Sequence, residues 1–243
     1  MINEFNNKVI LITGGSSGIG LNLISFFLKQ NAKIINISRR KPSIKNKKLK
    51  NISFDLNNFR KYDTLLTKVS KIFGPVNYFV HAAGIHLIKP VRIISEKDID
   101  KVMNINLKSP LLISKYLLDD KIFKRPSSVV LISSVVGVVG SSGHSIYSSS
   151  KAGLIGLTRS LSVELSRYKI RVNSISPGVI KSSLFSNYSK QVTSDINKKV
   201  IENHPLGIGN FGDINNAVKF LLSHKSKWMT GHNLIVDGGY SAQ

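Results

Sequence analysis

Cysteine is absent from this 243-residue sequence, which excludes disulfides and thiolate metal sites. Long apolar runs are absent as well: the longest, residues 129–139, is interrupted by Ser133, Ser134 and Gly137 and is too short to cross a bilayer. The first residues lack the basic-then-apolar order of a secretion signal. We therefore expect a soluble cytoplasmic protein with no membrane association and no metal site.

Acidic residues are scarce: 13 Asp and Glu stand against 35 Lys and Arg, a net charge of +22. Such an excess can serve nucleic acid, a membrane surface or an acidic partner protein. The lysines are mostly scattered, however, and only residues 41–50 form a dense cluster. An arginine-rich arm, zinc-finger spacing and an aromatic–basic RNA signature are all missing. The charge thus predicts attraction to acidic ligands rather than a nucleic-acid-binding function, with biased composition as the plain alternative.

Short apolar, β-branched runs alternate with helical patterns from end to end. They predict strands at residues 8–13, 33–38, 51–55, 76–80, 129–134, 170–175 and 233–237. A helix is expected to begin at Ser95, to break near residues 104–106 and to resume to about Leu118. This order predicts an α/β fold: a single doubly wound Rossmann-type domain over residues 1–243, with a parallel sheet of about seven strands.

A glycine-rich turn joins the first predicted strand to the first predicted helix, with Gly14, Gly18 and Gly20 in it. Small residues let the backbone approach a phosphate, and the free N–H groups and the dipole of the helix favour the anion. Glycine spacing alone is a weak signal. The flanking strand and helix supply the context that a dinucleotide site requires.

The second predicted strand ends in Ser38-Arg39-Arg40. Dinucleotide-binding units often carry an acid here that accepts hydrogen bonds from the adenosine ribose. No acid stands at this position, and an arginine can instead meet a 2′-phosphate. The sequence therefore favours NADP(H), with NAD(H) possible, and the alternative is that the arginines simply begin the basic stretch that ends at Lys50.

Tyr147 and Lys151 are four residues apart on a predicted helix, so they share one face. An ammonium about 4 Å from a phenolate, at an effective dielectric of about 20, is worth roughly 4 kcal/mol. This corresponds to about 3 pKa units, which would bring the pKa of the tyrosine near the physiological range. Such a pair can move a proton onto or off an oxygen. A lone pair of this kind is more often an ordinary helix surface, so the rest of the chain has to support the interpretation.

The chain resembles the short-chain dehydrogenases/reductases over nearly its whole length. Four motifs carry the resemblance, in the family's order: Thr13-Gly14-x3-Gly18-x-Gly20, Ala82-Ala83-Gly84, Ser134 with Tyr147-x3-Lys151, and Pro177-Gly178. Each motif is weak alone, and together they are highly specific. One departure is His81-Ala82, where many relatives have two asparagines that help to tie the sheet together.

The resemblance implies a catalytic set of Asn106, Ser134, Tyr147 and Lys151. Tyr147 would give or take the substrate proton, and Lys151 would lower its pKa and hold the nicotinamide ribose. Ser134 would hydrogen-bond the reacting carbonyl, with the neighbouring Ser133 as the alternative. Asn106 would hold a water that relays protons, with Asn104 as the alternative.

The resemblance also implies a set of cofactor-binding residues. Besides Tyr147 and Lys151 these are Gly14, Ser16, Ser17, Gly18, Ile19, Gly20, Ser38, Arg39, Asp55, Leu56, Ala83, Gly84, Pro177, Gly178, Val179, Ile180 and Ser182. Ser17 stands where many NADP-dependent relatives have a basic residue. His144 lies in a Gly/Ser-rich loop and is expected to be a substrate-loop or solvated residue.

Within the family, the chain is most similar to the 3-oxoacyl-(acyl-carrier-protein) reductases of fatty-acid synthesis. This implies a carbonyl substrate carried on an acidic acyl carrier protein, steered by a basic rim near Arg125, Arg167 and Lys169. Sugar, polyol and secondary-alcohol dehydrogenases share the same motifs and remain an alternative. Residues 182–205 are polar and weakly periodic, and they are a candidate lid over the substrate.

Relatives are commonly homotetramers, and the resemblance implies the same assembly here. Leu154, Ile155, Leu157, Leu161 and Val163 would supply part of the interface. Two other classes of function are a non-catalytic cofactor sensor and a basic nucleic-acid-binding protein on this fold. The intact catalytic set argues against the sensor, and binding that falls steeply with salt would identify the nucleic-acid-binding protein.

Overall fold

The computed structural model describes residues 3–182, 185–186 and 194–242. Seven strands form one sheet in the order β3-β2-β1-β4-β5-β6-β7, and each neighbouring pair is parallel. Their bounds are β1 Val9–Thr13, β2 Lys33–Ser38, β3 Leu49–Ser53, β4 Val76–His81, β5 Phe123–Ile132, β6 Ile170–Pro177 and β7 Asn233–Val236. The predicted doubly wound Rossmann-type fold is confirmed.

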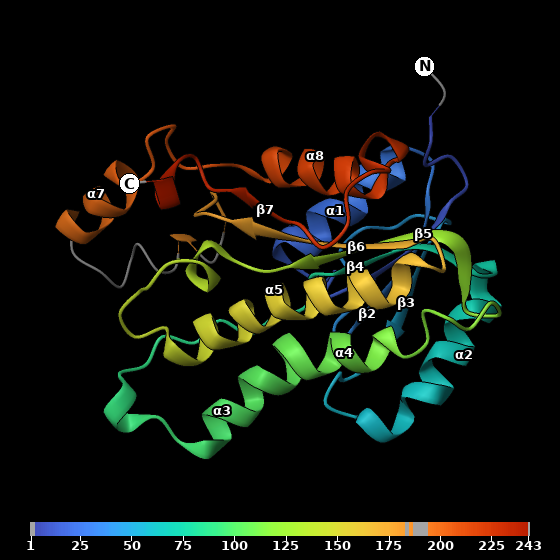
Figure 1. Cartoon of the computed structure of the whole chain (residues 1–243), viewed down its shortest axis with the longest axis horizontal. Coiled ribbons are helices and arrows are strands. Elements are labelled where there is room, and N and C mark those ends of the chain that lie inside the picture. Colours follow the sequence, from blue (N-terminus) through green and yellow to red (C-terminus); the bar gives the residue numbers. More distant parts are fainter. Residues whose placement is uncertain (1–2, 183–184, 187–193, 243) are drawn as a thin grey trace.

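Helices cover both faces of the sheet (Figure 1). Helices α1 (Gly18–Lys29) and α8 (Phe211–Leu222) lie on one face. Helices α2 (Tyr62–Phe73), α3 (Glu96–Met103), α4 (Ser109–Ser114) and α5 (Ser145–Ser166) lie on the other. Helix α7 (Ser194–Glu202) lies near the C-terminus, past the end of the sheet. In the part of the chain described, no helix is long and apolar enough to span a membrane.

Strand alternation divides the core into two layers. In β1, Val9 and Leu11 pack into the cluster under α2 and α5, whereas Ile10 and Ile12 pack into the cluster under α1 and α8. All four side chains are at most 4% exposed. The strands are therefore apolar on both faces, which is why they read as continuous runs rather than as alternating patterns.

Three element boundaries differ from the sequence prediction. Strand β5 begins at Phe123, six residues before the apolar run, because polar residues at its start still pair with β4 and β6. Strand β3 lies two residues earlier than predicted. The helix that begins after Ser95 does not break, because a π-helix (Asn104–Lys108) joins α3 to α4, and α4 ends at Ser114.

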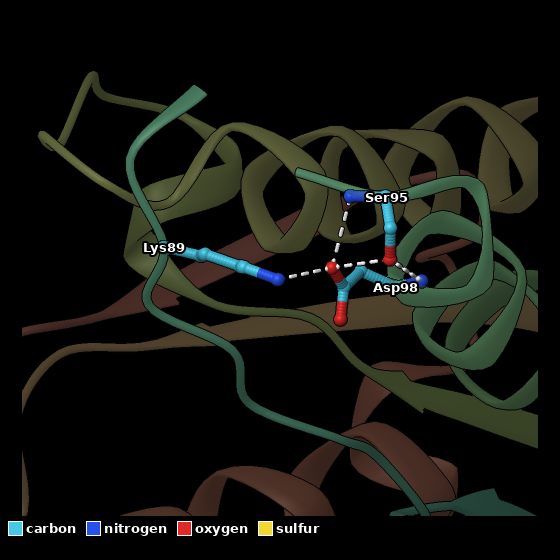
Figure 2. Close-up of polar contacts among 3 residues, drawn as sticks. All are labelled: Lys89, Ser95 and Asp98. Atoms are coloured by element: carbon cyan, nitrogen blue, oxygen red, sulfur yellow. Dashed lines mark hydrogen bonds and ion pairs between the residues drawn. The ribbon is translucent and has the colours of Figure 1, made fainter. Parts of the chain in front are cut away.

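The start of α3 is fixed by a capping box. The Ser95 hydroxyl accepts a hydrogen bond from the Asp98 N–H, and the Asp98 carboxylate accepts one from the Ser95 N–H. Lys89 Nζ lies 2.6 Å from the same carboxylate (Figure 2), and this contact is the main reason that the pKa of Asp98 falls below its usual range. The loop after β4 is thereby attached to α3.

The predicted tetramer surface is partly wrong. Leu154, Ile155 and Leu161 are each at most 8% exposed, because they pack toward the sheet within their own chain. Val163 is 77% exposed and remains available on the outer face of α5.

Candidate active site

A cavity of about 700 Å³ lies along the carboxyl ends of the central strands. Its wall includes every residue that the sequence analysis assigned to the cofactor except Gly20, and three of the four catalytic candidates: Ser134, Tyr147 and Lys151. The predicted lid, residues 182–205, falls largely on 183–184 and 187–193, which lie outside the described residues. One site thus unites motifs that are spread over more than 160 positions of the chain.

The glycine-rich turn closes tightly on its neighbours. Gly14 has φ +77°, and a Cβ on it would lie 2.5 Å from the Cα of Ala83. A Cβ on Gly20 would lie 2.5 Å from the Gly14 carbonyl oxygen, so Gly20 shapes the turn from behind the cavity wall. Helix α1 begins in this turn with no acidic residue and no side-chain cap in its first turn. Its first N–H groups are therefore suited to an anion.

The end of β2 faces the far end of the cavity. Arg39 and Arg40 line it and are exposed, while their carbonyl oxygens accept hydrogen bonds from Ser53 and Ser38 respectively. Behind them, the buried Asn36 accepts a hydrogen bond from the Gly15 N–H at 2.8 Å. The backbone is therefore fixed while both guanidinium groups stay free to turn toward a ligand.

Tyr147 does not have the lowered pKa that the sequence analysis expected. Burial raises the pKa of Tyr147 to about 12, and the hydrogen bond with Ser134 offsets only part of that rise. Lys151 Nζ donates to the Ile132 carbonyl oxygen at 2.7 Å and lies 5.6 Å from the centre of the tyrosine ring. The close ammonium–phenolate contact assumed from the sequence is therefore not formed. Tyr147 is neutral at pH 7 and can act as a proton donor.

Lys151 is itself almost completely buried, at 4% exposed. Burial lowers the pKa of its ammonium to about 8. The group therefore still carries its charge at pH 7, but only narrowly. This poise suits a residue that exchanges protons with its surroundings near neutral pH.

The two serines at the end of β5 have different partners. Ser133 is buried and donates its hydroxyl to the Lys151 carbonyl oxygen at 2.8 Å. Ser134 is half-buried and contacts the Tyr147 hydroxyl. This geometry agrees with the choice of Ser134 as the group that meets a substrate.

Asn106 lies behind the cavity wall rather than in it. Its side chain accepts a hydrogen bond from the Ile85 N–H at 2.7 Å and donates to the Ile85 carbonyl oxygen and to Ser150. The π-helix turns this side chain inward, where it is fully buried. Asn106 therefore connects the segment after β4 to α5.

His81, at the position where relatives often have asparagine, keeps a link between strands. Its Nδ1 lies 2.8 Å from the Thr13 hydroxyl, which joins the ends of β1 and β4. Burial and the charge of Lys151 lower the pKa of His81 to about 3, so the ring is neutral. In the described part of the chain its Nε2 has no hydrogen-bond partner.

The segment after Pro177 is held by a histidine that the sequence analysis did not single out. His204 Nε2 accepts a hydrogen bond from the Val179 N–H at 3.1 Å, and its Nδ1 donates to the Val200 carbonyl oxygen at 2.7 Å. The ring also packs on Tyr240. His204 therefore holds the backbone that the resemblance assigns to the nicotinamide end.

A second unpredicted residue, His86, faces His144 across the cavity. Their Nε2 atoms are 3.1 Å apart, and the His86 ring meets the Tyr147 ring edge-on with centroids 4.7 Å apart. His144 thus lies at the substrate end of the wall, as one of its two expected roles requires. The only sequence signal for His86 is its position two residues after Gly84.

The predicted basic rim is wrong. Arg167 and Lys169 precede the amino end of β6, and Arg125 lies seven residues before the end of β5, which is roughly 23 Å of extended strand. Arg125 also pairs with Asp120, and both arginines pack on the Tyr168 ring. These cations lie at the edge of the sheet opposite the cavity.

Comparison with protein families gives a match over residues 14–241 to the family described as enoyl-(acyl carrier protein) reductase. The 3-oxoacyl-(acyl-carrier-protein) reductase FabG of Rickettsia typhi is 34% identical over 240 residues, covering 97% of this chain and 98% of that protein.

Two solved structures illustrate the likeness of fold. A 4-hydroxyisoleucine dehydrogenase complexed with NADH is 31% identical, with a TM-score of 0.89, and covers 98% of this chain and 100% of its own. ElxO with NADP bound is 28% identical, with a TM-score of 0.88 and the same coverage. Structures of this likeness therefore include both an NADH complex and an NADP complex.

Proposed function

Because the chain belongs to the short-chain dehydrogenase/reductase family, we propose that it reduces the 3-keto group of an acyl thioester with NADPH. The observation that carries this proposal is the convergence of Ser134 and Tyr147 on one side of the cavity whose other end is lined by the glycine-rich turn and Arg39. The likeness to 3-oxoacyl-(acyl-carrier-protein) reductases over 97% of the chain supports the choice of thioester.

The residues present fit a dinucleotide. A Cβ on Gly84 would lie 3.5 Å from Lys151 Nζ, so the missing side chain leaves room beside the lysine. The uncapped start of α1 suits a pyrophosphate, and Arg39 and Arg40 suit a 2′-phosphate. When bound, the reduced nicotinamide supplies the hydride.

The side chains supply the proton and hold the carbonyl. The Ser134 hydroxyl can turn from Tyr147 to donate a hydrogen bond to the carbonyl oxygen, which steadies the negative charge that develops there. Tyr147, neutral with its pKa raised to about 12, donates its phenolic proton to the same oxygen. The Lys151 ammonium, 5.6 Å from the ring, then favours the phenolate.

A second candidate is the oxidation or reduction of a sugar, polyol or small secondary alcohol. The observation in its favour is polar: His86 and His144 stand beside Tyr147 at the end of the cavity where a long acyl chain would need apolar walls. The likeness to 4-hydroxyisoleucine dehydrogenase also favours a small polar substrate.

Turnover distinguishes the candidates. Purified protein would be given NADPH or NADH with a short 3-oxoacyl thioester in one series, and with keto-sugars and simple ketones in another. Fast NADPH oxidation with the thioester alone supports the main proposal. Silence with the thioester and turnover with a sugar or ketone moves the substrate to the second candidate and keeps the mechanism.

We also propose that the protein is a cytoplasmic homotetramer. The exposed Ile99, Leu111 and Val163 lie on α3, α4 and α5 and offer an apolar outer face for such contacts. A sedimentation experiment that finds only monomers at micromolar concentration contradicts this assembly.

A further inference from the structure

We propose that His86 and His144 form a two-ligand site for Zn²⁺ or a similar transition-metal ion at the substrate end of the cavity. The sequence analysis expected no metal site, because it considered thiolates and did not bring these two histidines together. Ion binding does not depend on the proposed reaction. The inhibition that would follow from it does rest on the proposed function.

The tautomer of His144 is set by its surroundings. Its Nδ1 lies 2.9 Å from the Ser142 carbonyl oxygen, which can only accept a hydrogen bond, so Nδ1 carries the proton. The Ser141 hydroxyl is also 2.9 Å away and can accept from the same N–H. The Nε2 lone pair of the neutral ring therefore points at His86. Metal-binding histidines are held in this way, with the distal N–H on a backbone carbonyl.

The spacing of the two rings fits a chelate. Zn²⁺ binds imidazole nitrogens at about 2.0–2.1 Å, so two ligands that subtend roughly 100° at the ion lie about 3.1 Å apart. The observed separation of the two Nε2 atoms is 3.1 Å. Neither ring has to move far to bind one ion.

His86 stays neutral as a ligand must. Burial, then the charges of His144 and Lys151, lower its pKa to about 4. Without an ion, its Nε2–H donates to His144. With an ion, that proton moves to Nδ1 and the Nε2 lone pair binds the metal, so the pair gives up no net proton.

The two loops that carry the rings are held together. The Lys89 N–H donates to the Gly143 carbonyl oxygen at 2.8 Å, and Lys89 Nζ is attached to Asp98 at the start of α3 (Figure 2). A Cβ on Gly143 would lie 3.0 Å from Ile88, which shows how closely the loops pack. The spacing of the rings is therefore part of the fold and does not depend on a ligand.

Two protein ligands leave the other coordination positions to water. Among the described residues, no group of three or more His, Asp or Glu could complete the site. Binding is therefore reversible and selective for ions that prefer imidazole, such as Zn²⁺, Cu²⁺ and Ni²⁺, over Mg²⁺ and Ca²⁺. An ion held here lies beside Tyr147, where the carbonyl substrate has to reach.

The test is direct titration of the cofactor-free protein, without an affinity tag, with Zn²⁺ in a non-chelating buffer. We expect one equivalent to bind, with affinity at least tenfold lower in His86→Gln and in His144→Gln and unchanged in His232→Gln, which alters an exposed histidine. NADPH fluorescence of each variant checks that the fold is intact. Equal Zn²⁺ affinity in all four proteins overturns the assignment, and so does the absence of binding at millimolar Zn²⁺.

The activity assay separates the two proposals. Zn²⁺ that binds this pair should inhibit the turnover of whichever substrate is found, competitively with the carbonyl compound, and His144→Gln should relieve the inhibition. Zn²⁺ binding in a protein that turns over no tested substrate leaves the ion site standing and removes the proposed function. Turnover that one equivalent of tightly bound Zn²⁺ does not slow removes the inhibition.

Discussion

Replacing Lys151 with methionine should stabilise the protein at pH 7 while abolishing turnover. The ammonium is 4% exposed, and burial lowers its pKa from 10.5 to about 8. At about 1.4 kcal/mol per pKa unit, this corresponds to roughly 3 kcal/mol of destabilisation while the group is charged in both states. Methionine has a similar length and carries no charge.

One hydrogen bond works against this gain. Lys151 Nζ donates to the Ile132 carbonyl oxygen, and methionine leaves that buried acceptor unpaired at a cost of about 1–3 kcal/mol. The expected net change is a gain of up to about 2 kcal/mol in the free energy of unfolding at pH 7. Urea unfolding at matched protein concentration measures it.

The pH dependence tests the reasoning independently. Between pH 8 and 10.5 the unfolded lysine still holds its proton while the folded one has lost it, so the unfolded state binds more protons and wild-type stability rises with pH. Above 10.5 both states are neutral and the penalty is gone. Lys151→Met should lack this rise. A variant that is less stable than wild type by the same amount at pH 7 and pH 10 would refute the account.

Tyr147→Phe should lower turnover roughly 10²–10⁴-fold, because it removes the proton donor, while NADPH affinity measured by fluorescence changes little; wild-type-like turnover would mean that another group is the acid. Gly14→Ala should weaken NADPH binding and cost about 1–3 kcal/mol of stability, because φ is +77° and the new Cβ meets Ala83 at 2.5 Å; Gly140→Ala, which meets nothing within 4 Å, is the matched control. Arg39→Glu should raise the KM for NADPH at least tenfold and leave the KM for NADH nearly unchanged, since only NADPH carries the 2′-phosphate; an equal change for both cofactors argues against this contact.

Local patterns were enough to predict most of the fold. Each strand except β5 begins and ends within two residues of its apolar run, because both of its faces are buried. Ser95 and Asp98 predicted the start of α3 for the same local reason, since a capping box involves only adjacent residues. The polar start of β5 carries no such signal, because its pairing with β4 depends on residues far away in the chain.

The candidate site shows the same limit. Motif spacing brought Ser134, Tyr147 and Lys151 to one wall, but it could not reveal that the lysine binds the Ile132 carbonyl oxygen instead of approaching the phenol. Spacing also could not pair His86 with His144, which lie 58 residues apart and meet only because a backbone hydrogen bond joins their loops.

The π-helix at Asn104–Lys108 has a consequence for the length of the chain at this point. A π turn holds one residue more than an α-helical turn, so that residue is what sets the phase of α4 relative to α3. Deleting one residue here would restore regular helix and rotate everything after it by about 100°. Ile113, now fully buried against the sheet, would turn toward solvent, so the segment should tolerate substitutions at exposed positions far better than a change in length.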